Sequence, residues 1–396
     1  MDAQTVIQWE HAYVLGTYVR PPVVFTHGKG VWLYDSEGNA YLDLVAGIAV
    51  NALGYGNEDI PRIMADQARK LIHVSNLYHT EPHVRLARLL CEHSFADKVF
   101  FCNSGAEANE AAIKFSRKYA RTHHGEGKTT IVAFEGAFHG RTFGALAITP
   151  RPHYQDPYRP LMPHVRILPF NDIAAAREGI TEDVAAVFVE PIQGEGGIRP
   201  AEEAFLHALR EITQEVDALL VFDEVQCGLA RTGTLWAHEQ YGVTPDILTV
   251  AKPLAGGLPM GAVLVTDKVA QVMEPGDHAT TFGGGAVVSA VGEYVVSRLS
   301  DKDFLDHVRE VGEHLMARLR DIEDPRIVDI RGRGLMVGIE MSVDVRPVVQ
   351  ASLDHGLVLV NAGPNVIRMV PPLIISKEEV DEAVDRFVQT LKASAG

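Results

Sequence analysis

The 396-residue sequence is 46% hydrophobic and 22% charged, which indicates a folded globular protein and excludes a disordered or fibrous one. Its 52 Asp and Glu residues against 36 Lys and Arg residues give a net charge of -16, which argues against general nucleic-acid binding because nucleic-acid backbones are also negative. Three widely separated cysteines, with no leader and no apolar run of membrane length, predict a cytoplasmic protein without disulfides or a membrane span.

The first elements are expected close to the N-terminus. Residues 23–44 alternate apolar and polar positions around two turn clusters, which predicts an antiparallel β-meander. Asn57 is a candidate N-cap for a helix that runs to Lys70, and a second helix is expected after Pro82 up to about Phe95.

The middle of the chain alternates short apolar strands with helices, the pattern of a mostly parallel sheet with helices on both faces. The strands are the runs VFFC, TIVAF, VAAVFVE, ALLVFDE, ILTVA and GAVLVT, and the helices cover 105–122 and 202–216. Long helices are then expected at 286–299 and 301–320, before strands and helices at closer spacing. The sequence therefore predicts a large α/β domain over 56–297 and a smaller α+β domain that combines 1–55 with 298–396.

Two short motifs resemble sites but fail the geometry that those sites require. The run GEGKT at 125–129 resembles the end of a phosphate-binding loop, yet Thr122 stands where that loop needs glycine, and the strand follows the glycines. His79 and His83 are spaced like a helical metal pair, but Pro82 lies between them and no further ligands complete a set. No metal site is therefore expected, and the absence of a G-x-S-x-G elbow weakens a hydrolase interpretation.

The stretch VFFCNSGAEANEAAIKF places a strand, a turn and the start of a helix in succession. Ser104 offers a hydroxyl, Gly105 permits close approach, and the free N–H groups at the helix start favour an anion such as phosphate. An ordinary capped turn has the same pattern, so this motif alone leaves both interpretations open.

Two further strands deliver ionisable residues at their carboxyl ends, where open α/β sheets bind ligands. The run ALLVFDEVQCG ends in Asp223 and Glu224, and Asp223 suits a pyridinium nitrogen, with a simple cap as the alternative. The run ILTVAKPLAGGLPMG places Lys252 after a strand and before a glycine-rich turn. Partial desolvation there would lower the pKa of Lys252, as a Schiff-base lysine requires, whereas a lone strand-end lysine is more often a surface residue.

An N-S-G-A turn, a strand-end Asp223 and a strand-end Lys252, in this order along the chain, resemble the fold-type I pyridoxal-phosphate enzymes. The stretches FCNSGAEANEAAIK, AFHGRTFGALAIT, VEPIQGEGG, VFDEVQCGLARTG and AKPLAGGLPMGA resemble the class III (ω-) aminotransferases, and the similarity extends from TYVRPPVVFTHGKG to VIRMVPPL. Within that family the sequence is most similar to the acetylornithine aminotransferases. The resemblance implies pyridoxal 5'-phosphate as cofactor, a large domain with a seven-stranded type of sheet, and a homodimer that shares the cofactor site across its interface.

The resemblance also implies a role in cofactor binding for each matching residue. Glu190 would steady the residues that contact the cofactor without touching the cofactor itself. The alternative, nearly as well supported, is that Glu190 is an ordinary carboxylate at the end of a strand. The cofactor residues would be Ser104, Gly105 and Ala106 on the phosphate, Phe138 stacked on the pyridine ring, Asp223 on the pyridinium nitrogen, Gln226 near the phenolic oxygen, Lys252 as the Schiff-base lysine and proton carrier, and Thr281 from the other subunit.

Substrate binding is implied on the same basis. Arg141 would hold the α-carboxylate of the amine substrate and Arg368 that of glutamate or 2-oxoglutarate, since the planar fork of arginine matches a carboxylate. Glu195 would pair with Arg368 while the amine is bound and swing away for glutamate. Tyr18 aligns with a tyrosine that contacts substrate in related ornithine enzymes, with simple packing as the alternative.

The implied reaction moves the distal amino group of N-acetylornithine to 2-oxoglutarate, giving N-acetylglutamate 5-semialdehyde and glutamate, a step of arginine biosynthesis. Ornithine, 4-aminobutyrate, succinylornithine and a carrier-linked lysine are alternative amino donors. An aminomutase and a non-catalytic binding protein are further alternatives, the second opposed by the presence of Lys252 and Asp223. The sequence departs from the family pattern at 55–58, which reads YGNE for a His-x-His-Pro run, and at 283–286, which reads GGGA for Gly-Gly-Asn-Pro.

Overall fold

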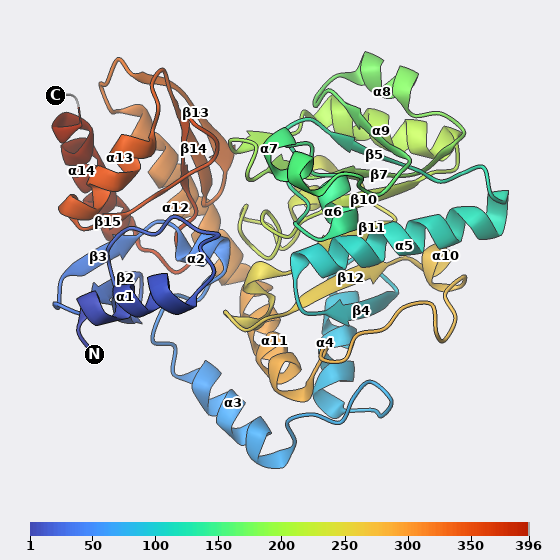
Figure 1. The fold of residues 1–396 in the computed structure, drawn as a ribbon, viewed down its shortest axis with the longest axis horizontal. Coiled ribbons are helices and arrows are strands. Elements are labelled where there is room, and N and C mark those ends of the chain that lie inside the picture. The colour runs from blue at the N-terminus through green and yellow to red at the C-terminus, as the bar shows by residue number, and fades with distance from the viewer. Residues whose placement is uncertain (395–396) are drawn as a thin grey trace.

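The computed structural model describes residues 1–394, and a seven-stranded sheet in the order β4-β12-β11-β10-β7-β5-β6 lies at its centre (Figure 1). Strand β12 is antiparallel to both of its neighbours, and the other pairings are parallel, which confirms the predicted mostly parallel sheet. The strands are β4 (Lys98–Cys102), β5 (Thr130–Phe134), β6 (Val165–Leu168), β7 (Val184–Val189), β10 (Leu219–Asp223), β11 (Ile247–Val250) and β12 (Gly261–Val265).

Each face of this sheet has its own apolar core, because successive side chains of a strand point to opposite faces. Val221 of β10 packs in a cluster with α5 (Gly105–His124), whereas the next residue, Phe222, packs in a cluster with α9 (Glu203–Glu215). In Figure 1, β5, β7 and β10 lie between these two helices. The predicted covering of both faces by helices is therefore confirmed.

The parallel strands position the polar residues that follow them. Because β4, β7, β10 and β11 all end at the same edge of the sheet, Ser104, Glu190, Asp223 and Lys252 come together there.

The two ends of the chain combine in smaller sheets. Strands β1, β2 and β3 form the predicted antiparallel meander, and β15, from the far end of the chain, pairs parallel to β3. A second sheet has the order β13-β14-β17-β16, and α12 packs between it and α14. The predicted domain boundaries stay predictions. The bounds are α1 (Ala3–Tyr13), β1 (Phe25–Lys29), β2 (Trp32–Asp35), β3 (Ala40–Asp43), α2 (Ala46–Ala49), α12 (Lys302–Arg320), β13 (Ile327–Arg333), β14 (Met336–Met341), α13 (Arg346–Ala351), η4 (Ser352–His355), β15 (Leu357–Val358), β16 (Val360–Asn361), β17 (Val366–Met369) and α14 (Lys377–Ala393).

The helices before the large sheet follow the sequence prediction with one difference each. The N-cap of α3 (Asp59–Lys70) is Glu58, one residue after the predicted Asn57, although Asn57 still accepts the N–H of Asp59 at its Oδ1 over 3.0 Å. Helix α4 (Glu81–Glu92) ends before the predicted Phe95, since Ser94 Oγ accepts the backbone N–H of Ala96 over 3.1 Å and turns the chain toward β4.

The remaining elements are short apart from α11, which has the predicted bounds. No helix within the described residues is both long and apolar enough to cross a membrane. The cytoplasmic location stays a prediction. The bounds are α6 (Phe143–Ala147), α7 (Pro152–Gln155), η1 (Asp156–Tyr158), α8 (Ile173–Gly179), β8 (Ile192–Gln193), β9 (Arg199–Pro200), η2 (Ala237–Tyr241), η3 (Lys252–Ala255), α10 (Asp267–Ala270) and α11 (Ala286–Leu299).

Candidate active site

The turn after β4 presents free backbone N–H groups at the start of α5. Ser104 is the N-cap: its backbone is extended, and its Oγ accepts the N–H of Glu107 over 3.2 Å. Gly105 and Ala106 form the first turn, whose N–H groups have no partner within the helix. Position 105 requires glycine, because a Cβ there would lie 2.7 Å from Cγ1 of Val225. This turn can bind an anion through backbone N–H groups and the helix dipole.

Asp223 is the centre of a buried hydrogen-bond network at the end of β10. Its side chain is buried, and Oδ2 accepts from Nδ2 of Asn109 over 2.8 Å and contacts Nδ1 of His139 at 2.7 Å. Its Oδ1 accepts the N–H of Val225 over 3.0 Å. Asn109 is itself held by the hydroxyl of Thr249, which donates to its Oδ1 over 2.8 Å. The carboxylate is therefore fixed in orientation.

Lys252 follows β11 in a conformation that few non-glycine residues adopt. Its φ is +39°, in the left-handed region, where an L-residue is strained, and such strain is concentrated at functional sites. Burial lowers the pKa of Lys252, an effect that the negative charge of Asp223 only partly opposes. A larger fraction of the molecules therefore has Lys252 as the neutral amine, the form that attacks a carbonyl and accepts a proton.

Glu190 supports the neighbouring loop from behind. Its Oε1 accepts the N–H of Phe138 over 3.0 Å, and its Oε2 accepts the N–H of Gly194 over 3.0 Å. Burial raises the pKa of Glu190 to about 7. The side chain of Phe138 is half-buried and lines the cavity described below.

Arg368 lies on β17 with a carboxylate over its guanidinium. Its side chain is 1% exposed, and Nη1 is 2.5 Å from Oε1 of Glu195 and 3.1 Å from Oε1 of Gln226. Burial by itself would raise the pKa of Glu195, but the charge and hydrogen bond of Arg368, together with the charges of Lys252 and Arg151, outweigh it and lower the pKa. The Glu195 side chain is therefore a carboxylate.

Arg141, unlike Arg368, is not paired with a carboxylate among the described residues. It is exposed, and its Cζ lies 3.3 Å from the ring centroid of Tyr154 and 5.7 Å from that of Phe138. Within residues 1–394 no carboxylate is at ion-pair distance from Arg141, so its guanidinium is available to a ligand carboxylate.

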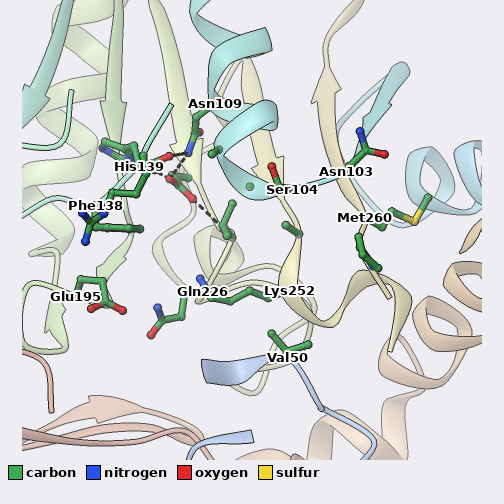
Figure 2. Close-up of a pocket in the computed structure, with 18 of the residues that line it drawn as sticks. Val50, Asn103, Ser104, Asn109, Phe138, His139, Glu195, Gln226, Lys252 and Met260 are labelled. Atoms are coloured by element: carbon green, nitrogen blue, oxygen red, sulfur yellow. Dashed lines mark hydrogen bonds and ion pairs between the residues drawn. The ribbon is translucent and has the colours of Figure 1, made fainter. Parts of the chain in front are cut away.

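Apart from Arg368, these residues line a cavity of about 430 Å³, shown in Figure 2. The structure brings together most of the predicted site, and Arg368 reaches it through Glu195 and Gln226. Two predicted residues lie elsewhere: Tyr18 is 73% exposed, and Thr281 is exposed beside the loop around Asn76. The predicted residues that line the cavity are Ser104, Gly105, Ala106, Phe138, Arg141, Glu190, Glu195, Asp223, Gln226 and Lys252.

Two functional residues escaped the sequence prediction, His139 and Asn109. Burial would lower the pKa of His139, but the hydrogen bond and charge of Asp223 raise it overall. Its Nε2 is buried without a partner among the described residues. A signal did exist, since His139 follows Phe138 in the AFHGRT stretch and Asn109 lies in the first turns of α5, but nothing local connects either one to Asp223.

The family profile described as class-III aminotransferase matches residues 15–391. The chain belongs to the class-III aminotransferase family. Members of this family are transaminases that use pyridoxal 5'-phosphate, so the predicted enzyme class and cofactor are confirmed.

Named relatives cover nearly the whole chain. The mitochondrial acetylornithine aminotransferase of Alnus glutinosa is 50% identical over 96% of this chain and 86% of its own length. The acetylornithine aminotransferase of Clostridium acetobutylicum is 44% identical over 96% of this chain and 99% of its own.

Solved structures of the same family confirm the predicted fold. The N-acetylornithine aminotransferase of Stenotrophomonas maltophilia K279a superposes with a TM-score of 0.85 at 37% identity, covering 98% of each chain. The ornithine aminotransferase of Toxoplasma gondii ME49 superposes with a TM-score of 0.95 at 30% identity, covering 99% of this chain and 96% of that one.

The cavity fits pyridoxal 5'-phosphate chemically. Its donor set offers free N–H groups for a dianion at Ser104–Ala106 and a partly desolvated amine at Lys252. The Asp223 carboxylate accepts three hydrogen bonds of the roughly four that it can take. One acceptor position therefore remains for a protonated ring nitrogen.

Proposed function

We propose that this chain transfers the distal amino group of N-acetylornithine to 2-oxoglutarate, giving N-acetylglutamate 5-semialdehyde and glutamate, in arginine biosynthesis. The observation that carries the proposal is that two arginines of one site differ in their partners. Arg141 has no carboxylate partner among the described residues and is open to a ligand, whereas Arg368 is paired with Glu195. The names of the relatives, acetylornithine aminotransferases at 44–50% identity, agree with it.

The two states suit the two substrates. An amine whose only carboxylate lies far from the reacting nitrogen needs one free arginine, and Arg141 at the mouth of the cavity supplies it. A dicarboxylic keto acid needs a second arginine, which Arg368 supplies once Glu195 leaves it. One site can thus accept a monocarboxylate and a dicarboxylate in turn.

Several residues would hold the cofactor. Ser104, Gly105 and Ala106 would bind its phosphate, Phe138 would cover its ring, and Asp223 would keep its ring nitrogen protonated. Gln226 would lie near its phenolic oxygen. When bound, the cofactor supplies an electron sink for the substrate carbon that loses a proton.

Lys252 is the group that moves the proton. As a neutral amine it would take the proton from the carbon that bears the substrate nitrogen and return it to the carbon on the other side of that nitrogen. Asn109 and His139 keep the Asp223 carboxylate oriented throughout, because both contact its Oδ2.

The proposal includes a homodimer in which Thr281 of a second copy reaches the phosphate turn. Thr281 stands among exposed apolar side chains: Leu77 is 84% exposed and Phe282 is 66% exposed. Asn76 donates to the carbonyls of Thr280 and Gly283 over 3.0 Å each, so the two loops form one surface. Exposed apolar surface of this kind is typical of protein–protein interfaces.

The donor is tested by mixing the pyridoxal form with single amines, without keto acid, and following conversion to the pyridoxamine form by absorbance. N-Acetylornithine should convert fastest among N-acetylornithine, ornithine, succinylornithine and 4-aminobutyrate. Equal or faster conversion of another donor would overturn the choice of substrate.

A pair of variants tests the carboxylate contact. Arg141→Gln should lower kcat/KM for N-acetylornithine about 100-fold, because a bidentate charged contact is lost, and should leave putrescine, which has no carboxylate, unchanged. Arg177→Gln is the control, since Arg177 is a surface residue of α8 paired with Glu211. An equal loss for both amines would assign Arg141 a purely structural role.

A further inference from the structure

A second cavity lies directly beside Glu195. It has about 690 Å³, and its lining includes residues 362–366 and three arginines, Arg151, Arg199 and Arg331. Glu195 lines this cavity as well as the active-site cavity. Its side chain therefore stands at the boundary between the two.

The three arginines differ in how their charges are compensated. Arg331 is fully engaged, because Nη1 is 2.5 Å from Glu340 and 2.8 Å from Asp329. Arg151 contacts only backbone oxygens: Nη2 donates to the carbonyl of Glu195 over 2.7 Å and, more weakly, to that of Gly136 over 3.3 Å.

Two further observations show that Arg151 has spare capacity. Within residues 1–394 no carboxylate lies at ion-pair distance from it, and its Nε is buried without a partner. Arg199, on the exposed strand β9, adds a second charge to the same cavity, and its Cζ lies 5.9 Å from the ring of Phe170. Neither Arg151 nor Arg199 is therefore paired with a carboxylate among the described residues, although Glu195 and Glu340 also line the cavity.

Glu195 has to leave Arg368 whenever a dicarboxylate binds there, because two carboxylates on one buried guanidinium repel each other. Its backbone is held in place by Arg151, and the adjoining loop is packed so closely that a Cβ at Gly196 would lie 2.7 Å from the carbonyl of Gly136. The movement is therefore a rotation of the side chain among its rotamers, not a shift of the loop.

We propose that Arg151 is the second partner of the Glu195 carboxylate: when a dicarboxylate occupies Arg368, Glu195 rotates into the second cavity and pairs with Arg151. The Arg151 guanidinium already touches the backbone carbonyl of Glu195, so it lies within reach of the side chain of the same residue. This inference rests on the proposed function, in which 2-oxoglutarate is the amino acceptor. Arg151 is a positioning residue, since it acts through Glu195.

The effect on binding follows from the equilibrium between the two positions of Glu195. A dicarboxylate binds only to molecules in which Arg368 is uncovered, so its apparent affinity scales with the population of the outward position. Arg151 stabilises that position and thereby raises the affinity. The amine substrate, with its single carboxylate, does not need Arg368, and its binding should not depend on Arg151.

Calorimetry of glutarate binding to the pyridoxal holoenzyme tests the inference, because glutarate has both carboxylates and no reactive carbonyl. Arg151→Gln should weaken binding about tenfold, the size expected from one charged contact, and Arg151→Lys should retain most of the affinity. In a Glu195→Gln background the Arg151→Gln change should have no effect, because no carboxylate remains to be seated. Arg331→Gln, which removes another brace of the same hairpin, controls for loosening of the loop.

Three results would contradict the inference. Equal glutarate affinity of the wild type and Arg151→Gln would overturn this inference and leave the proposed function untouched. An Arg151→Gln loss that persists undiminished in the Glu195→Gln background, or that also lowers the rate of the N-acetylornithine half-reaction, would make Arg151 a structural brace. A wild-type holoenzyme that does not bind glutarate at all would overturn both this inference and 2-oxoglutarate as acceptor.

Discussion

Removing the charge of Glu195 should make the site prefer dicarboxylates. In Glu195→Gln the guanidinium of Arg368 loses the carboxylate that lies 2.5 Å away, and a dicarboxylate no longer has to displace it. Charged hydrogen bonds contribute about 1.5–3 kcal/mol. The side chain of Glu195 is 27% exposed, so solvent screening argues for the lower end. A gain of about 1.5 kcal/mol corresponds to roughly tenfold tighter binding of glutarate.

The assay has two parts. Calorimetry with glutarate measures the gain in affinity, and stopped-flow absorbance compares the half-reactions with glutamate and with N-acetylornithine. The glutamate half-reaction should reach half-saturation at about tenfold lower concentration. Glu340→Gln is the matched control, because Glu340 pairs with Arg331 in the neighbouring cavity and not with Arg368.

Glutarate binding that is unchanged or weaker in Glu195→Gln would refute the reasoning. It would mean that Glu195 does not compete with the ligand for Arg368, and the ion pair would then be part of the permanent framework of β17.

Three more predictions concern the interior of the site. Lys252→Ala should lower kcat at least about 10³-fold, because the proton carrier is lost, and turnover at the wild-type rate would disprove the role of Lys252 as that carrier. Urea unfolding of the same variant should show no loss of stability, since burying an amine is costly. Asp223→Ala should cost about 3 kcal/mol of unfolding free energy in the cofactor-free protein, since Asn109 and His139 lose a buried partner, and a cost below about 1 kcal/mol would contradict the network. Burial raises the pKa of Glu190 to about 7, so the folded protein holds a proton that the unfolded chain has lost, and stability should fall as the pH rises from about 5 to 7. Glu190→Gln, which cannot ionise, should remove that slope in thermal unfolding of the cofactor-free protein, and an unaltered slope would exclude Glu190 as its source.

Much of the fold could be read from local patterns. Strands β7 and β12 are continuous apolar runs, as strands buried on both faces must be, and α11 begins and ends where its periodicity predicts. Strand β6 was missed because it is a four-residue edge strand with Arg166 in it, too short and too polar to stand out. The antiparallel direction of β12 was also not predicted, since it follows from the short glycine-rich return after Lys252, with no crossover helix.

The sequence by itself determined the alternation of strands and helices, the turn at Ser104 that begins α5 and the strand-end positions of Asp223 and Lys252, because neighbouring residues encode each of these. The resemblance implied that Glu195 pairs with Arg368, but only the tertiary structure shows these two residues, 173 positions apart, in contact, and only it places Arg151 against the backbone carbonyl of Glu195. Those contacts depend on how the hairpin of β8 and β9 packs against β13, which belongs to the same sheet as β17. Charge pairing across such distances has no local pattern, since it exists only once separate elements have been brought into one core.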